Sequence, residues 1–141
     1  MPRMISTLLD SRVLWFLARL LLAVVFLSSG LAKVLAWDNS VAEMQAAGLQ
    51  PPALFNIASA VVLLGGSLCL LLDRLLWLGS GALAVFILLT IVIVHTFWTK
   101  HGAEQQLAMF FALEHLSVVG GLICAGIASH ARAQKNSSSN R

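Results

Sequence analysis

The hydrophobic positions of the chain gather into four long apolar segments separated by short polar ones. A helix that crosses about 30 Å of hydrocarbon needs ~20 mainly apolar residues. Segments of this length cover about residues 13–36, 53–72, 75–98 and 106–129. Each segment predicts a transmembrane helix. We therefore expect an all-α membrane protein, folded as an antiparallel four-transmembrane-helix bundle.

The residues between the segments support this division. Pro51 and Pro52 precede the second segment, and proline suits a helix start because a missing N–H costs nothing there. Asp73 and Arg74 end that segment so close to the third that the two must form an antiparallel hairpin. The fourth segment gives way to a polar stretch, Gln134 to Arg141, which we expect to be disordered.

The domain organisation that follows is a single membrane domain with two polar ends. We place a cytoplasmic N-terminal segment at residues 1–12, the membrane domain at 13–129 and a polar cytoplasmic tail at 130–141. The first span could be taken for a secretory signal, but Lys33 lies awkwardly before a cleavage point, so we expect the span to be retained.

Composition excludes several classes of protein. The chain is 59% hydrophobic and 11% charged, with a mean hydropathy of +0.89, whereas soluble domains are about a quarter charged. Intrinsic disorder and a large multidomain enzyme are excluded as well, by hydrophobicity and by length. The net charge of +3 does not indicate nucleic-acid binding, because the basic residues lie at the edges of apolar segments.

Lysine and arginine positions predict the orientation. Four spans leave both termini on one side, and the side richer in Lys and Arg is cytoplasmic. Seven of these residues lie at or near the side of the termini, against Lys33 and Lys100 on the other. We expect a multi-pass protein of the inner (plasma) membrane with both termini in the cytoplasm.

Two cations interrupt the first span. Arg19 and Lys33 are 14 residues apart, which leaves them about 40° apart around a helix and ~21 Å apart along it. Phe26 and Gly30 share their stripe. Both cations could reach opposite interfaces with their long stems. Alternatively, the stripe faces inward and at least one cation pairs with an acid on another helix.

Glu114 is the most costly residue of the fourth span. A carboxylate at a helix centre costs roughly 2.5–3.5 kcal/mol and has no long stem with which to reach water. Glu114 shares a stripe of small residues with Ser117 and Gly121, and such stripes let helices approach closely. We expect Glu114 to face the bundle as a buried charge, with a packing contact as the alternative.

Depth predicts one polar pocket in the outer half of the bundle. In an antiparallel bundle the outward ends of all helices share one leaflet, so the pocket candidates are Lys33, His95, Trp98, Glu114 and His115. Charge favours a Lys33–Glu114 pair. The alternative is that His95 and Trp98 are ordinary residues of the membrane interface.

Other reactive residues form no recognisable site. Cys69 and Cys124 lie within spans and lack a Cys-x-x-Cys pattern, so we expect them to serve packing. The four histidines lack metal-ligand spacing, and no metal is expected. Helix packing is assigned to glycines in three spans, namely Gly30, Gly65, Gly66, Gly120 and Gly121.

Several segments together resemble the DoxX family of small bacterial membrane proteins. The resemblance covers about residues 15–128 and rests on order and spacing. Its segments are Leu17 to Leu20 with Phe26, Gly30 and Lys33, then Trp37 to Val41, Met44 to Pro52, Leu63 to Gly66, His95 to Trp98 and Val118 to Gly121. Two positions depart from the family pattern. Val62 stands where a Glu is common, and Glu114-His115 stands where Lys-Asn is frequent.

The resemblance implies a link to redox chemistry. Some relatives are similar to subunits of sulfur-oxidising, quinone-linked oxidoreductases, and others are associated with membrane complexes that resist oxidative stress. We expect an accessory membrane subunit of a redox or stress-response system rather than a self-sufficient enzyme. Its partners would be the lipid bilayer and a membrane or periplasmic redox protein, and a quinone or similar small hydrophobic molecule would be its ligand. The alternatives are a small proton-coupled transporter or channel and a structural helix-packing partner.

Overall fold

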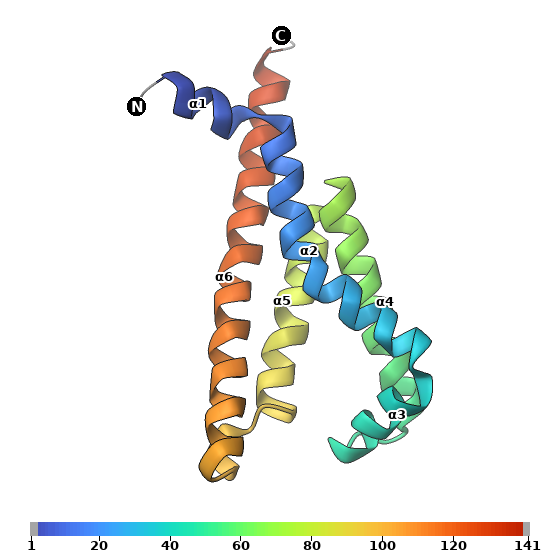
Figure 1. The fold of residues 1–141 in the computed structure, drawn as a ribbon. Helices are drawn as coiled ribbons and strands as arrows, with labels where there is room; N and C mark the ends of the chain where they lie inside the picture. Colours follow the sequence, from blue (N-terminus) through green and yellow to red (C-terminus); the bar gives the residue numbers. More distant parts are fainter. Residues whose placement is uncertain (1–2, 140–141) are drawn as a thin grey trace.

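The computed structural model describes residues 3–139, and all the regular structure in this range is helical. The order is α1 (Arg3–Asp10), α2 (Arg12–Leu35), α3 (Trp37–Ala46), α4 (Pro52–Leu72), α5 (Leu76–Ile93), the short 3-10 helix η1 (Phe97–Thr99) and α6 (Gly102–Ser139). Within this range four helical segments are long and apolar enough to cross a membrane, and they start with α2, α4, α5 and α6. They run antiparallel (Figure 1), so the predicted fold class is confirmed.

Local sequence explains where the spanning helices begin and end. Ser11 caps α2, because its hydroxyl accepts a hydrogen bond from the backbone N–H of Leu14 at 3.4 Å. Pro52 is the first residue of α4. The turn to α5 places Asp73 and Leu75 in the left-handed region, with φ of 55° and 52°. This three-residue turn reverses the chain and forms the predicted hairpin.

Two polar segments are more ordered than the sequence suggested. The first connection between spans contains α3, a ten-residue helix that packs on α2 and α4. The expected disorder after Gln134 was wrong, because α6 continues without a break to Ser139; residues 140–141 lie outside the described range. Contacts with the N-terminal segment, described below, hold this last part of α6.

The core extends from the middle of the spans towards the end of the bundle that carries the termini. We call the end with the termini the terminal end, and we call the opposite end, which carries α3 and η1, the loop end. The buried apolar cluster combines side chains of all four spans: Ala23, Phe26, Leu63, Leu70, Leu76, Leu83, Ile87, Leu122 and Ala125. Within the described residues α2 packs on α4, α4 on α5, and α5 on α6.

Towards the loop end the bundle divides into two arms. Figure 1 shows α2 following α4 away from α6, while α5 and α6 remain side by side. Within the described range α3 touches only α2 and α4, and η1 touches only α6. One arm therefore comprises α2, α3 and α4, and the other comprises α5, η1 and α6.

Glycines explain which helices approach closely. A Cβ at Gly30 would lie 2.8 Å from a methyl carbon of Leu64, so Gly30 lets α2 pack tightly on α4. A Cβ at Gly66 would overlap Leu83 of α5. Gly121 lies beside Leu22 of α2, whereas Gly65 and Gly120 have open space where a Cβ would point. The five predicted packing glycines thus divide into inward-facing and outward-facing positions.

The N-terminal helix α1 lies across the end of the bundle instead of along it (Figure 1). Its apolar side chains Met4, Ile5 and Leu8 are exposed. An amphipathic helix of this kind suits the boundary between headgroups and acyl chains. The orientation of α1 is the one expected of a helix that lies along a membrane surface.

Candidate functional site

Lys33 forms the centre of a polar cluster in the first arm. The stripe of α2 that carries Arg19, Phe26, Gly30 and Lys33 is buried. The Lys33 Nζ donates to Oε2 of Glu43 on α3 at 3.1 Å, and the exposed fractions of the two side chains are 11% and 67%. The aliphatic stem of Lys33 is therefore buried, and its ammonium group is paired with Glu43 at the loop end of this arm.

Asn56 of α4 ties the same cluster to the backbone. It is fully buried, and its Nδ2 donates to the backbone oxygen of Lys33 at 3.0 Å. Its Oδ1 is buried without a hydrogen-bond partner among the described residues. The amide thus fixes α2 against α4 where the two helices leave the rest of the bundle.

The second arm gathers aromatic and titratable groups. The rings of His95 and His115 are edge to face with centroids 4.9 Å apart, and His95 lies 5.2 Å from the Phe111 ring. Trp98 is exposed and packs against Phe97. Glu114 is exposed on α6. This cluster could offer imidazole N–H donors, a flat aromatic face and a carboxyl group to a neighbouring molecule.

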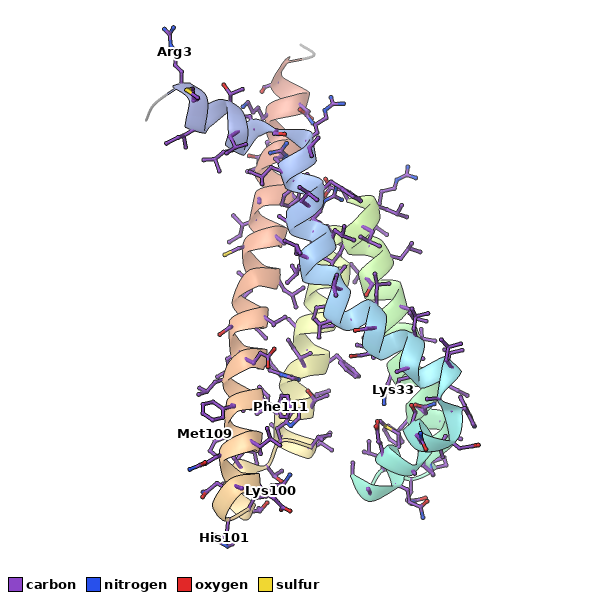
Figure 2. The ribbon with its side chains drawn as sticks, viewed as in Figure 1. Arg3, Lys33, Lys100, His101, Met109 and Phe111 are labelled. Carbon is purple, nitrogen blue, oxygen red and sulfur yellow. The ribbon has the colours of Figure 1, made fainter. Side chains whose placement is uncertain are left out.

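The structure does not bring the five pocket candidates together. Figure 2 shows Lys33 and Phe111 on different arms. The expected Lys33–Glu114 pair is absent, since Lys33 bonds Glu43, and the expectation that Glu114 is a buried charge was wrong. The physical reason is the close approach of Gly30 to Leu64, which draws α2 towards α4 and away from Glu114.

Arg19 lies at the opposite end of α2 and is also buried. Its Nη1 donates to the backbone oxygens of Leu70 and Leu71 at 2.9 and 3.0 Å. These carbonyls belong to the last turn of α4, where no further helical N–H is available to them. Arg19 therefore caps α4 from a neighbouring helix.

Asp73, in the turn after α4, joins three helices at the same end. It accepts hydrogen bonds from Trp15 Nε1 at 2.6 Å and from the Ser129 hydroxyl at 2.9 Å, and its Oδ2 lies 3.9 Å from Arg19 Nη1. The guanidinium groups of Arg19 and Arg132 lie over the Trp15 ring, 5.2 and 5.6 Å from its centroid. The turn is thereby bonded to α2 and α6.

The C-terminal part of α6 is held by the N-terminal segment. Arg132 donates to the backbone oxygens of Leu9 and Asp10 at 3.4 and 3.0 Å, and Lys135 Nζ lies 3.0 Å from Oδ1 of Asp10. Between these groups is a cavity of about 500 Å³, lined by α1, α2, the α4–α5 turn and α6. This cavity lies at the terminal end, whereas the sequence predicted a pocket at the loop end.

The structure also gives the positions of the residues that metal or thiol chemistry would need. In the part of the chain that the structure describes, no three His, Cys, Asp or Glu side chains gather as metal ligands would. Both cysteines are free thiols; Cys69 is partly buried beside Gly79, and Cys124 is exposed.

Sequence reasoning missed the partners of the two buried cations. Asp73 was treated only as a helix end, although it and Arg19 both lie near the terminal end of adjacent spans. Glu43 lies in the polar stretch between the first two apolar segments, where the sequence predicted no helix. It is nevertheless only ten residues from Lys33 along the chain. Trp15 lies one helical turn before Arg19. Nothing in the sequence except the polar N–H of its apolar ring indicates that it bonds Asp73.

Comparison with known families gives a clear result. The family described as DoxX matches residues 14–96, which is more than half of the chain and includes α2 to α5. No curated protein and no solved structure shows significant similarity to the chain. The matched region contains the buried stripe of α2, the α4–α5 hairpin and His95. The chain is therefore an integral membrane protein that belongs to the DoxX family.

Proposed function

We propose that this chain is an accessory subunit of a redox or oxidative-stress system in the bacterial inner membrane. In this proposal it holds a quinone or another small lipophilic molecule between its arms at the loop end. The redox assignment comes from the family, and the site comes from the arrangement of the second arm. The excess of Lys and Arg near the termini supports cytoplasmic ends and a loop end that faces outward.

The observation that carries the proposal is the exposure of Glu114. Gly121, seven residues further along α6, contacts Leu22 of α2, and seven residues bring a helix back to nearly the same side. Glu114 therefore lies on the side of α6 that meets α2 nearer the terminal end, at a level where α2 has moved away (Figure 1). A carboxyl group at this position in a span needs a proton or a partner.

Other side chains of the second arm suit a quinone. The carbonyl oxygens of a quinone accept hydrogen bonds, and imidazole N–H groups of His95 or His115 can donate them. Phe111 supplies an aromatic face against which a flat ring can stack. Ligand sites in bundles are commonly built from a few polar groups among apolar side chains.

Quinone binding can be measured on the purified chain in lipid nanodiscs. We expect decylubiquinone to raise the melting temperature, and Glu114→Gln or His95→Leu to weaken this effect at least about fivefold in apparent affinity, the loss of one hydrogen bond of about 1 kcal/mol. The matched control is Glu104→Gln, which removes an exposed acid in the first turn of the same helix. No shift with the quinone, or an equal loss in the control, would refute the proposal.

Packing against another membrane protein is a second candidate function. Gly65, Gly81 and Gly120 present surfaces on which a Cβ would meet nothing within 4 Å, and small residues allow close helix approach. Replacement of Gly120 by Leu should then abolish co-purification of a partner without lowering the melting temperature. Transport receives less support, because the buried layer of Phe26, Leu63, Leu83 and Leu122 separates the polar groups of the two ends.

A further inference from the structure

The cavity at the terminal end carries an excess of positive charge. Its walls include four cationic side chains, Arg12, Arg19, Arg132 and Lys135, and two carboxylates, Asp10 and Asp73. Each carboxylate already accepts hydrogen bonds from protein groups, Asp73 from Trp15 and Ser129, and Asp10 from Lys135. The excess of two positive charges is therefore left without a counter-charge in the described part of the chain.

The cations keep donors that the protein does not use. Arg19 is 7% exposed, and its Nε is buried with no hydrogen-bond partner among residues 3–139. Arg132 donates only to neutral backbone oxygens, so its charge is not compensated. Arg12 forms no ion pair with any carboxylate that the structure describes. Burying an unpartnered donor of a charged group is costly, which indicates that a ligand completes this site.

We propose that the terminal-end cavity binds the phosphoryl headgroup of an anionic phospholipid. Arginine forks match the oxygens of phosphate, and lysine adds a point charge. Basic pockets between transmembrane helices bind such headgroups when they lie at the level of the membrane surface. A cavity of about 500 Å³ is large enough for a headgroup.

The position of the cavity favours a lipid over a soluble phosphate compound. Its walls come from the residues at which the apolar part of each span ends: Arg12 begins α2, Asp73 follows α4, and Ser129 ends the apolar part of α6. The exposed apolar residues of α1 place the same level at the membrane surface. A lipid phosphate already lies at this depth, with its acyl chains beside the apolar faces of the spans.

The test compares two arginines of the same end. Arg12 lines the cavity, whereas Arg74, also exposed and within the α4–α5 turn, does not. Full-length protein would be placed in phosphatidylcholine nanodiscs with increasing fractions of phosphatidylglycerol or cardiolipin. Lipid retained on the protein would be measured by native mass spectrometry, together with the melting temperature.

We expect selective retention of anionic lipid and a higher melting temperature in its presence. Loss of one hydrogen bond to the phosphoryl group, about 1 kcal/mol, corresponds to about fivefold in affinity, so Arg12→Gln should weaken retention about fivefold and Arg12→Gln with Arg132→Gln about 25-fold. Arg74→Gln should retain the lipid as the unaltered protein does. If the double variant does not fold in phosphatidylcholine, the comparison of Arg12→Gln with Arg74→Gln still decides the outcome.

Glycerol 3-phosphate distinguishes the two sources of a phosphoryl group. If it stabilises the protein in phosphatidylcholine as strongly as anionic lipid does, and Arg12→Gln abolishes the effect, the ligand is a soluble phosphate compound and the lipid assignment is overturned. Equal losses in Arg12→Gln and Arg74→Gln would overturn the site itself, because they would show general attraction to a charged surface. Equal retention of neutral and anionic lipid would overturn it as well.

Discussion

Two adjacent glycines of α4 should respond in opposite ways to the same substitution. A Cβ at Gly66 would lie 2.5 Å from Cγ of Leu83 and 2.8 and 2.9 Å from its two methyl carbons. Leu83 is fully buried in the core, and the nearest atom is its branch point, so the whole side chain must move. A Cβ at Gly65 would meet nothing within 4 Å.

The difference between Gly66→Ala and Gly65→Ala isolates the cost of overpacking. Alanine in a helix interior is favoured over glycine by roughly 1 kcal/mol, and this gain is common to both variants. Overpacking a dense core costs about 1–3 kcal/mol. We therefore expect Gly66→Ala to be less stable than Gly65→Ala by about 1–3 kcal/mol, with Gly65→Ala equal to or more stable than the original chain.

Both variants can be compared by reversible unfolding in mixed micelles, followed through tryptophan fluorescence. The chain has four tryptophans and no tyrosine, so the signal reports tertiary structure around these residues. Two variants of equal stability would refute the close crossing of α4 and α5 at Gly66. A loss at Gly65 alone would show that this face is covered by a second molecule.

Three further predictions concern contacts of the buried cations, the cysteines and the α4–α5 turn. A double-mutant cycle of Lys33→Met and Glu43→Gln should give a coupling of about 0.2–1 kcal/mol, since Glu43 is 67% exposed; zero coupling in unfolding titrations would contradict the pair. Cys69→Leu should destabilise the fold by about 1–3 kcal/mol because it overpacks against α5, while Cys124→Leu should change stability by less than about 0.5 kcal/mol. Ser129→Ala should lower stability by about 1 kcal/mol through loss of its hydrogen bond to the turn, and an unchanged melting temperature would argue against that bond.

The fold could be predicted because the thickness of the bilayer determines how long an apolar segment must be to cross it. An apolar segment long enough to span hydrocarbon has few alternatives to a helix, since unsatisfied backbone groups are too costly in lipid. The same constraint does not apply outside the hydrocarbon. This explains why α3 and the end of α6, both polar, were not predicted as helices.

The candidate site was harder to predict because depth and lateral position are different quantities. Residue counting places Lys33, His95 and Glu114 at one level, but it does not say which helices are neighbours at that level. That order depends on side-chain volumes at close contacts, such as Gly30 against Leu64. The sequence therefore left both an interfacial and an inward position open for Arg19 and Lys33, which the structure buries, and it favoured Glu114 as the partner of Lys33, which pairs with Glu43 instead.

Glu114 provides the clearest way to separate stability from function. The two buried cations of α2, Arg19 and Lys33, have carboxylate partners outside the apolar spans, in the α4–α5 turn and in α3, whereas Glu114 forms no ion pair with any residue that the structure describes. If nothing else binds it, Glu114→Leu should stabilise the purified chain by up to about 3 kcal/mol, the cost of a carboxylate in a span. The variant should at the same time lose the melting-temperature shift with quinone. If the variant is instead less stable than the original chain in nanodiscs, Glu114 already has a partner in the membrane. The two arms would then pack around that partner.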